Sequence, residues 1–478
     1  MIRSIIHSII MSILSTLVLV SCQVGTTKKV RISVTTTDPK VREIKLNISA
    51  MVSPETTSLS EAKIDPSGNA VFEFDLPHPV FASMELGKQW VALYLEPGYD
   101  LKINLDTIPE KEIVFSGKGA DPNYYLSRSH VIYKPYEHRG GKYLWGLTPS
   151  QFVVRLDSLK YDFATFHLRF CDSTHLSESI SGILEMNNRL NLISFRQNYL
   201  LAHRQDITSS GHLPVLLTNI SKDIPFEDDL LNYHIDNYGM VLSWYLELDI
   251  ENPLSEKYKG TKDFKKLIPR LINDSLEKYS EYPVDVKEFL LARNIYCQMD
   301  YNREGTVIDS LFDNFKKSYP SSDYLSQLQI RADKRRDLLP GKAAPDLTGT
   351  TLDDKPFSIK ELKGKIVYID VWATWCGPCR AEFPASKKLR KKFDQDKNVV
   401  FLYLSIDRDV KAWKKLVTTD KDLKGIHINQ QDDNVLKSYL IKGPCYLLID
   451  QEGKIVNSNA PKPSSGKVEI EINKLLKR

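Results

Sequence analysis

A Cys-x-x-Cys motif at Cys376 and Cys379 constrains this chain more than any other feature. The motif follows an apolar run, residues 366–371, which predicts a buried β-strand, and it precedes residues 380–393, which predict a helix. Two thiols three positions apart at the first turn of a helix can close a small disulfide ring. The helix dipole and the free amide groups of that turn stabilise a thiolate on the first cysteine.

A structural disulfide and half of a zinc site are the alternatives for this pair. No second Cys-x-x-Cys or Cys/His pair has the spacing that the other half of a zinc site needs, so we expect no metal. We predict that Cys376 is the attacking thiol and that Cys379 is the resolving thiol, which attacks the mixed disulfide. Pro378 fits an early helix position and restrains the ring. No cofactor is expected besides the Cys376–Cys379 disulfide itself.

At 478 residues the chain is expected to hold about two to four domains. Residues 30–118 alternate apolar and polar positions in short runs between turn signals, which predicts a β-sandwich-like domain. Residues 119–337 predict a helical domain, in which Thr148 and Gln151 form a capping box at the start of the clearest helix. The order of elements in residues 338–478 predicts an α/β domain with helices on both faces of its sheet. The predicted fold class is therefore multidomain.

Residues 1–22 have the form of a bacterial lipoprotein signal peptide. Arg3 gives a positive start, and the apolar stretch 5–20 is too short for a comfortable membrane span. Small residues before Cys22 resemble the lipobox, in which the cysteine receives lipid. Residues 23–29 then read as a tether. This predicts a periplasm-facing lipoprotein of the cell envelope, held to the membrane by the lipid; an ordinary signal peptide or a membrane anchor that leaves Cys22 as a plain thiol is the alternative.

Net charge and the remaining cysteines add two limits. The formal net charge of +4 is small for this length and argues against a nucleic-acid partner. Once Cys22 and the redox pair are set aside, Cys171, Cys297 and Cys445 remain, and an odd number leaves at least one free thiol if no intermolecular bond forms. Two buried thiols at Cys171 and Cys297 are the default expectation, with a disulfide between them as the alternative.

The C-terminal region carries several further motifs: GKAAPDL at 341–347, WATWCGPCRAEFP at 372–384, Gly-Pro at 443–444 and LLIDQEGKIV at 447–456. Together they resemble the membrane-tethered, thioredoxin-like disulfide reductases of the TlpA/ResA type. The region before them resembles, more faintly, the β-then-helical extension found before such domains in Bacteroides-type bacteria. The resemblance implies a C-terminal thioredoxin-like fold and a thiol-disulfide oxidoreductase. It further implies a protein disulfide reductase that acts on exported proteins and receives its electrons from a membrane donor.

Two acidic residues near the motif are candidate catalytic residues. Asp370 lies six residues before Cys376 in an apolar strand, where loss of hydration would raise its pKa toward a value useful for proton transfer. An aspartate at the strand end that faces water is the alternative. Glu382, three residues after Cys379, matches an acidic residue of ResA-like reductases, and a glutamate on the helix surface is the alternative.

The resemblance also implies a substrate-binding surface made of Trp375, Pro378, Gly443 and Pro444. Pro444 matches the cis-proline that faces the Cys-x-x-Cys in thioredoxin folds, where the backbone can pair with an extended substrate segment. Gly443 departs from the family, which often has Ile, Thr or Val there. Cys445 is a third thiol near the pair; it either fills the strand, alters substrate choice or traps a side disulfide.

Two other functions compete with a disulfide reductase. A thiol peroxidase of the peroxiredoxin class needs Pro and Thr at seven and three residues before its reactive cysteine, where this chain has Ile369 and Ala373. A scaffold or binding lipoprotein would use the region before residue 338 for its main role. The intact Cys376/Cys379 pair argues against a purely structural role, so we favour the reductase.

Overall fold

The computed structural model describes residues 28–37, 42–53, 56–86, 89–105, 113–133, 144, 146–203, 213–301, 306–420, 423–441 and 445–477. The chain divides into two compact units, which meet in the sequence between Val241 and Leu242. Cys22, Gly443 and Pro444 lie outside the described residues, so the signal peptide, the lipid site and the cis-proline stay predictions. Within the described ranges, no helix has the length and apolar character that a membrane span requires.

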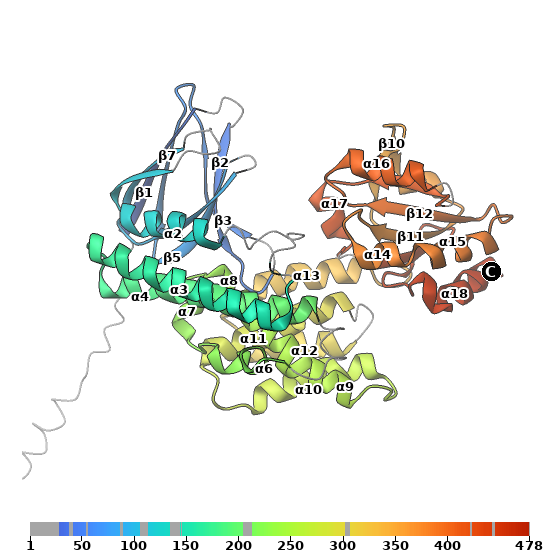
Figure 1. Ribbon diagram of the computed structural model, residues 1–478. Helices are drawn as coiled ribbons and strands as arrows, with labels where there is room; N and C mark the ends of the chain where they lie inside the picture. The colour runs from blue at the N-terminus through green and yellow to red at the C-terminus, as the bar shows by residue number, and fades with distance from the viewer. Residues whose placement is uncertain are drawn as a thin grey trace, which may run out of the picture. The chain divides into compact units, whose positions relative to one another are not determined.

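The first unit begins with two four-stranded sheets, ordered β4-β1-β7-β8 and β3-β2-β5-β6 (Figure 1). Their strands are β1 Lys28–Thr36, β2 Glu43–Ser49, β3 Thr56–Lys63, β4 Asn69–Leu76, β5 Val80–Leu86, β6 Gln89–Leu95, β7 Asp100–Leu105 and β8 Val114–Lys118. Alternate residues are buried along β1 and β7, as the period of two requires. Because β1 starts at Lys28, the last two residues of the predicted tether belong to a strand.

Helices follow the sheets in the first unit. They are α2 Ala120–Tyr133, α3 Pro149–Ser173, α4 Glu178–Ala202, α6 Val215–Thr218, η2 Ile220–Asp223, α7 Asp228–Asn232 and α8 Asp236–Tyr245, the last of which crosses into the second unit. The predicted capping box is present, because Thr148 and Gln151 exchange hydrogen bonds at the start of α3. Neither Cys171 nor Cys297 is in a disulfide, so a disulfide between them is the wrong alternative. Both are of intermediate exposure, whereas the default expectation had them buried.

The second unit continues with helices. They are η3 Leu246–Glu251, α9 Asn252–Lys257, α10 Phe264–Lys278, α11 Val284–Tyr301, α12 Thr306–Ser318 and α13 Leu325–Asp337. Ion pairs join α13 to its neighbours. Arg331 binds Asp300 of α11 in a buried pair, and the buried Arg335 binds the half-exposed Asp309 of α12 at 2.6 Å. The β-rich start and the helical middle match the predicted multidomain fold class.

The second unit ends in a seven-stranded sheet ordered β10-β9-β13-β12-β11-β14-β15. The strands are β9 Thr348–Thr351, β10 Pro356–Ser358, β11 Ile366–Trp372, β12 Val399–Ser405, β13 Ile426–Asn429, β14 Cys445–Ile449 and β15 Ile455–Asn457. The helices are η4 Ile359–Leu362, α14 Gly377–Ala381, α15 Phe383–Lys392, α16 Val410–Thr419, α17 Asp433–Ser438, η5 Pro463–Ser465 and α18 Lys467–Leu476. Strand β11 is central, parallel to β12 and antiparallel to β14.

Both faces of this sheet are covered, which is why every residue of β11 is buried. One core contains Trp372 and Cys379, with apolar side chains of α15, α16 and α18. The other contains Val371 and Cys445, with side chains of α17. Cys445 therefore packs in the core on the face of the sheet opposite the redox pair, where it is buried and forms no disulfide.

The helix that follows the motif is broken at Glu382, where α14 ends and α15 begins. Pro384 occupies the first turn of α15. Proline has no amide hydrogen, and inside a helix its ring collides with the carbonyl of the residue four positions earlier, which kinks or breaks the helix. The helix predicted over residues 380–393 is interrupted in this way, and its two parts join at Glu382.

Candidate active site

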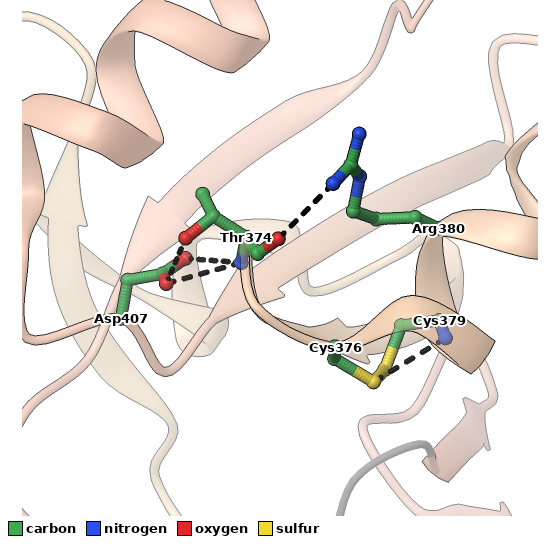
Figure 2. The surroundings of a disulfide bond; sticks show 5 residues. All are labelled: Thr374, Cys376, Cys379, Arg380 and Asp407. Atoms are coloured by element: carbon green, nitrogen blue, oxygen red, sulfur yellow. Dashed lines mark hydrogen bonds between the residues drawn. A yellow bond between two sulfur atoms is a disulfide. The ribbon is translucent and has the colours of Figure 1, made fainter. Parts of the chain in front are cut away.

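Cys376 and Cys379 are joined by a disulfide at the start of α14, as Figure 2 shows. Cys376 is the N-cap residue, and its Sγ accepts a hydrogen bond from the backbone amide of Cys379 at 3.3 Å. The Cys376 residue is 8% exposed and Cys379 is 0% exposed. Both residues are buried, but only Cys376 keeps some surface in contact with solvent, and it lies at the helix end where amide groups favour a thiolate.

The loop before the disulfide is fixed by Asp407, which follows β12. Its carboxylate accepts the backbone amide of Thr374 at 2.9 Å and the Thr374 hydroxyl at 2.6 Å (Figure 2). The Ser405 hydroxyl donates to the same carboxylate at 2.8 Å, and the side-chain amide of Asn429 donates to the Asp407 carbonyl at 2.9 Å. Arg380 in turn donates to the Thr374 carbonyl at 3.4 Å.

Asp407 is a residue of the site that our sequence analysis missed. The available signal was its position just after an apolar strand that runs parallel to β11, because the carboxyl ends of parallel strands meet at one edge of a sheet. Its partner Thr374 lies inside the motif, but a small polar residue there does not by itself indicate a bond to a distant carboxylate.

Asp370 is 1% exposed on β11, so the alternative of an aspartate that faces water is wrong. Burial, and then the negative charge of Glu382, raise its pKa from 3.8 to about 8. Within the described residues no donor meets full hydrogen-bond geometry at either carboxyl oxygen, although the Ser386 hydroxyl is near enough to lower the pKa in part. At neutral pH the protonated form therefore predominates, which is the state of a group that can give up a proton.

Glu382 is held in place rather than free on the helix surface. Its carboxylate accepts the Ser464 amide at 2.9 Å and the Ser464 hydroxyl at 2.8 Å, and Lys462 Nζ lies 3.1 Å away. Burial acts to raise its pKa, but the hydrogen bonds of Ser464 and the charge of Lys462 outweigh it and hold the pKa below its usual value. Glu382 is thus ionised at the pH where Asp370 is protonated.

Two of the four candidate substrate-binding residues lie at the surface beside the reactive sulfur. Trp375 directly precedes Cys376 and is 69% exposed. Pro378 is exposed in the first turn of α14. In the described part of the chain, no group of three or more His, Cys, Asp or Glu side chains could hold a metal ion.

Comparison with known proteins identifies the family. A model of the redoxin family, described as Redoxin, matches residues 339–475. The thioredoxin-like protein YneN of Bacillus subtilis (strain 168) is 35% identical over 123 residues, which are 24% of this chain and 68% of that protein. The chain belongs to the thioredoxin-like proteins. The predicted C-terminal thioredoxin-like fold and the resemblance to the ResA type are confirmed.

Two further proteins similar to this chain are described as thiol-disulfide oxidoreductases. The thiol-disulfide oxidoreductase ResA of Bacillus thuringiensis subsp. konkukian (strain 97-27) is 35% identical over 117 residues, 24% of this chain and 66% of that protein. The chain thus spans just under two thirds of the length of that relative. A putative thiol-disulfide oxidoreductase from Bacteroides vulgatus has a crystal structure with 36% identity and a TM-score of 0.28; the match covers 29% of this chain and 98% of that one.

Proposed function

We propose that this protein reduces disulfide bonds of exported proteins outside the cytoplasm, with Cys376 as the attacking thiol and Cys379 as the resolving thiol. The observation that carries the proposal is the difference in exposure between the two sulfurs, 8% against 0% for the residues. A substrate disulfide can reach Cys376 beside the exposed Trp375, whereas Cys379 can reach only a sulfur already bonded to Cys376.

The reaction begins with both thiols reduced. The Cys376 thiolate attacks one sulfur of the substrate disulfide, forms a mixed disulfide, and displaces the other substrate sulfur as a thiolate that takes up a proton. The Cys379 thiolate then attacks Sγ of Cys376, closes the Cys376–Cys379 disulfide and releases the second substrate thiol. Two electrons have passed from the enzyme to the substrate, and the enzyme disulfide must be reduced again before the next turnover.

Asp370 is placed to manage the proton of the buried Cys379 thiol. It lies between Tyr368 and Trp372 on β11, on the face whose core contains Cys379. A buried thiol is a poor nucleophile until it loses its proton. Because the pKa of Asp370 is about 8, only its ionised fraction, which grows as the pH rises toward 8, can accept that proton. We assign Asp370 this role, with Glu382 as the charge that keeps its pKa high.

The rest of the proposal concerns location and partners. The lipobox-like residues before Cys22 support a lipid tether in the cell envelope, facing the periplasm. The sequence contains no flavin or nicotinamide motif, so the electrons come from another molecule. We propose a membrane donor, as the resemblance to the ResA type implies. Labelled palmitate should enter the wild-type chain and not C22A; equal labelling of both would contradict the tether.

Reduction of insulin by the full-length chain, driven by dithiothreitol, tests the activity. We expect C376S to lose the catalysed rate, because no other thiol of the pair reaches solvent. We expect C379S to accumulate a mixed disulfide with its substrate, because the resolving thiol is gone. C171S is the matched control, as it removes a free thiol of intermediate exposure in the first unit and should keep the wild-type rate.

Three outcomes would change the proposal. Full insulin reduction by C376S would refute the assigned nucleophile. Rapid turnover of hydrogen peroxide without insulin reduction would favour the thiol peroxidase. Unchanged physiology in cells that carry C376S would favour a scaffold whose main role lies before residue 338.

A further inference from the structure

Lys462 and Ser464 lie on the segment between β15 and α18, and both contact the acidic residue at the break of the active-site helix. Ser464 holds both carboxylate oxygens of Glu382, one through its backbone amide and one through its hydroxyl. Lys462 contacts the same side chain, which is 13% exposed. These contacts are not part of the hydrogen bonding within α14 or α15; they hold the carboxylate of Glu382 in place.

The same segment is bonded to the strand that carries Asp370, β11, and to its neighbour β14. The Tyr368 hydroxyl, two residues before Asp370 on β11, donates to the Pro461 carbonyl at 2.8 Å. The Ala460 amide donates at 2.8 Å to the carbonyl of Tyr446, which pairs with Asp370 across β11 and β14. The rings of Tyr368 and Tyr446 are stacked, with centroids 5.8 Å apart. Residues 460–464 therefore connect Glu382 to the immediate neighbours of Asp370.

We propose that Lys462 and Ser464 are positioning residues that hold the ionised Glu382 carboxylate near Asp370 and thereby govern proton exchange in the active site. The proposal rests on the disulfide exchange proposed above. Neither residue touches the reacting sulfurs; both act through Glu382. Their segment lies far from the Cys-x-x-Cys motif in the sequence, and no motif marks it.

The groups that face Asp370 come from four elements. Glu382 supplies the charge that opposes its ionisation, and Ser386 of α15 acts in the other direction. Three tyrosine hydroxyls have a raised pKa, mainly through burial and in part through the charge of the Asp370 carboxylate. They belong to Tyr368 on β11, Tyr403 on β12 and Tyr446 on β14. Lys462 is absent from the groups that act on Asp370 directly, so its effect passes through Glu382.

The direction in which the pKa of Asp370 changes distinguishes two roles of Lys462 and Ser464: holding Glu382 in position, and a direct effect of the Lys462 charge. If Glu382 loses its charge or moves toward solvent, the Asp370 carboxylate is less opposed and ionises at lower pH. Loss of the positive charge of Lys462, taken alone, leaves the negative charge of Glu382 less compensated and so does not lower the pKa of Asp370. A downward shift after removal of Lys462 and Ser464 therefore reports displacement of Glu382.

The test follows the equilibrium of the full-length Cys376–Cys379 disulfide with dithiothreitol across pH, by tryptophan fluorescence. We expect E382Q to move the inflection assigned to Asp370 down by about one pH unit. We expect K462M/S464A to move it down by less, and the triple variant E382Q/K462M/S464A to match E382Q. K392M is the control, since Lys392 forms an exposed pair with Glu469 at 2.6 Å on the same domain and should leave the inflection unchanged.

An unchanged or raised inflection in K462M/S464A overturns the proposal, as does a triple variant that falls clearly below E382Q. If the double variant does not fold, S464A alone replaces it, and we expect a smaller downward shift of the inflection assigned to Asp370. Insulin reduction is measured on the same samples. If the wild type fails to reduce insulin while the inflections shift as described, the proposed function falls and the positioning role stands.

Discussion

Asp370 and Asp407 are both buried aspartates, one on β11 and one just beyond the neighbouring strand β12, yet their surroundings differ. Asp407 accepts hydrogen bonds from the amide and hydroxyl of Thr374 and from the Ser405 hydroxyl. Asp370 has no donor in full hydrogen-bond geometry within the described residues, and its pKa rises to about 8. The difference shows that the donors around a buried carboxylate decide whether it anchors a loop or exchanges a proton.

The largest expected effect is on the pH dependence of stability at Asp370. Its pKa is about 8 in the folded chain against 3.8 for an unperturbed aspartate. Below about pH 4 both states hold the proton and the residue contributes nothing. Between about pH 4 and pH 8 the folded state holds a proton that the unfolded state has lost, so the free energy of unfolding falls as pH rises. Above about pH 8 Asp370 is ionised in both states, so the free energy of unfolding no longer changes with its titration.

D370N should remove this fall, which amounts to a difference on the order of 6 kcal/mol across the window. Hydrogen exchange of β11 amides in the full-length chain measures it locally, with both proteins compared at each pH. Parallel curves for the wild type and D370N would show that Asp370 is already ionised near neutral pH, and the contrast with Asp407 would then collapse.

The second prediction tests the anchoring role of Asp407. D407A leaves the Thr374 amide and hydroxyl and the Ser405 hydroxyl without their acceptor, so we expect the domain to lose about 3 kcal/mol of stability. The dithiothreitol reduction rate of Cys376–Cys379 should change as well, because the loop before Cys376 is released. Thermal unfolding of the full chain and the reduction rate are the measurements.

D409A is the matched control for this substitution. Asp409 caps α16 through a single bond to the Ala412 amide at 3.0 Å, and its loss should cost about 1 kcal/mol without changing the reduction rate. Equal effects of D407A and D409A on both measurements would show that Asp407 contributes no more than a single helix cap does.

The redox pair and the buried Asp370 could be predicted from sequence because their signals are local: a spacing of three, and an acid within an apolar strand. The capping box at Thr148 was readable for the same reason. Asp407 and the Ser464 contact to Glu382 were not, because each joins residues brought together only by the sheet. The position of Cys445 across the sheet from the pair also depends on strand register, which the sequence order of the cysteines does not contain.

The smallest expected effect isolates one bond of the Asp407 anchor. T374V removes the hydroxyl that donates to Asp407 at 2.6 Å and keeps both the side-chain volume and the backbone amide bond. We expect a loss of about 1–2 kcal/mol, since the acceptor is a buried carboxylate that retains its other donors. T418V is the control. Thr418 is exposed on α16, its hydroxyl donates to backbone carbonyls of the same helix, and loss of that hydroxyl should be nearly neutral. If T374V costs no more than T418V, the backbone amide alone fixes the loop, and Thr374 contributes to the anchor only through its main chain.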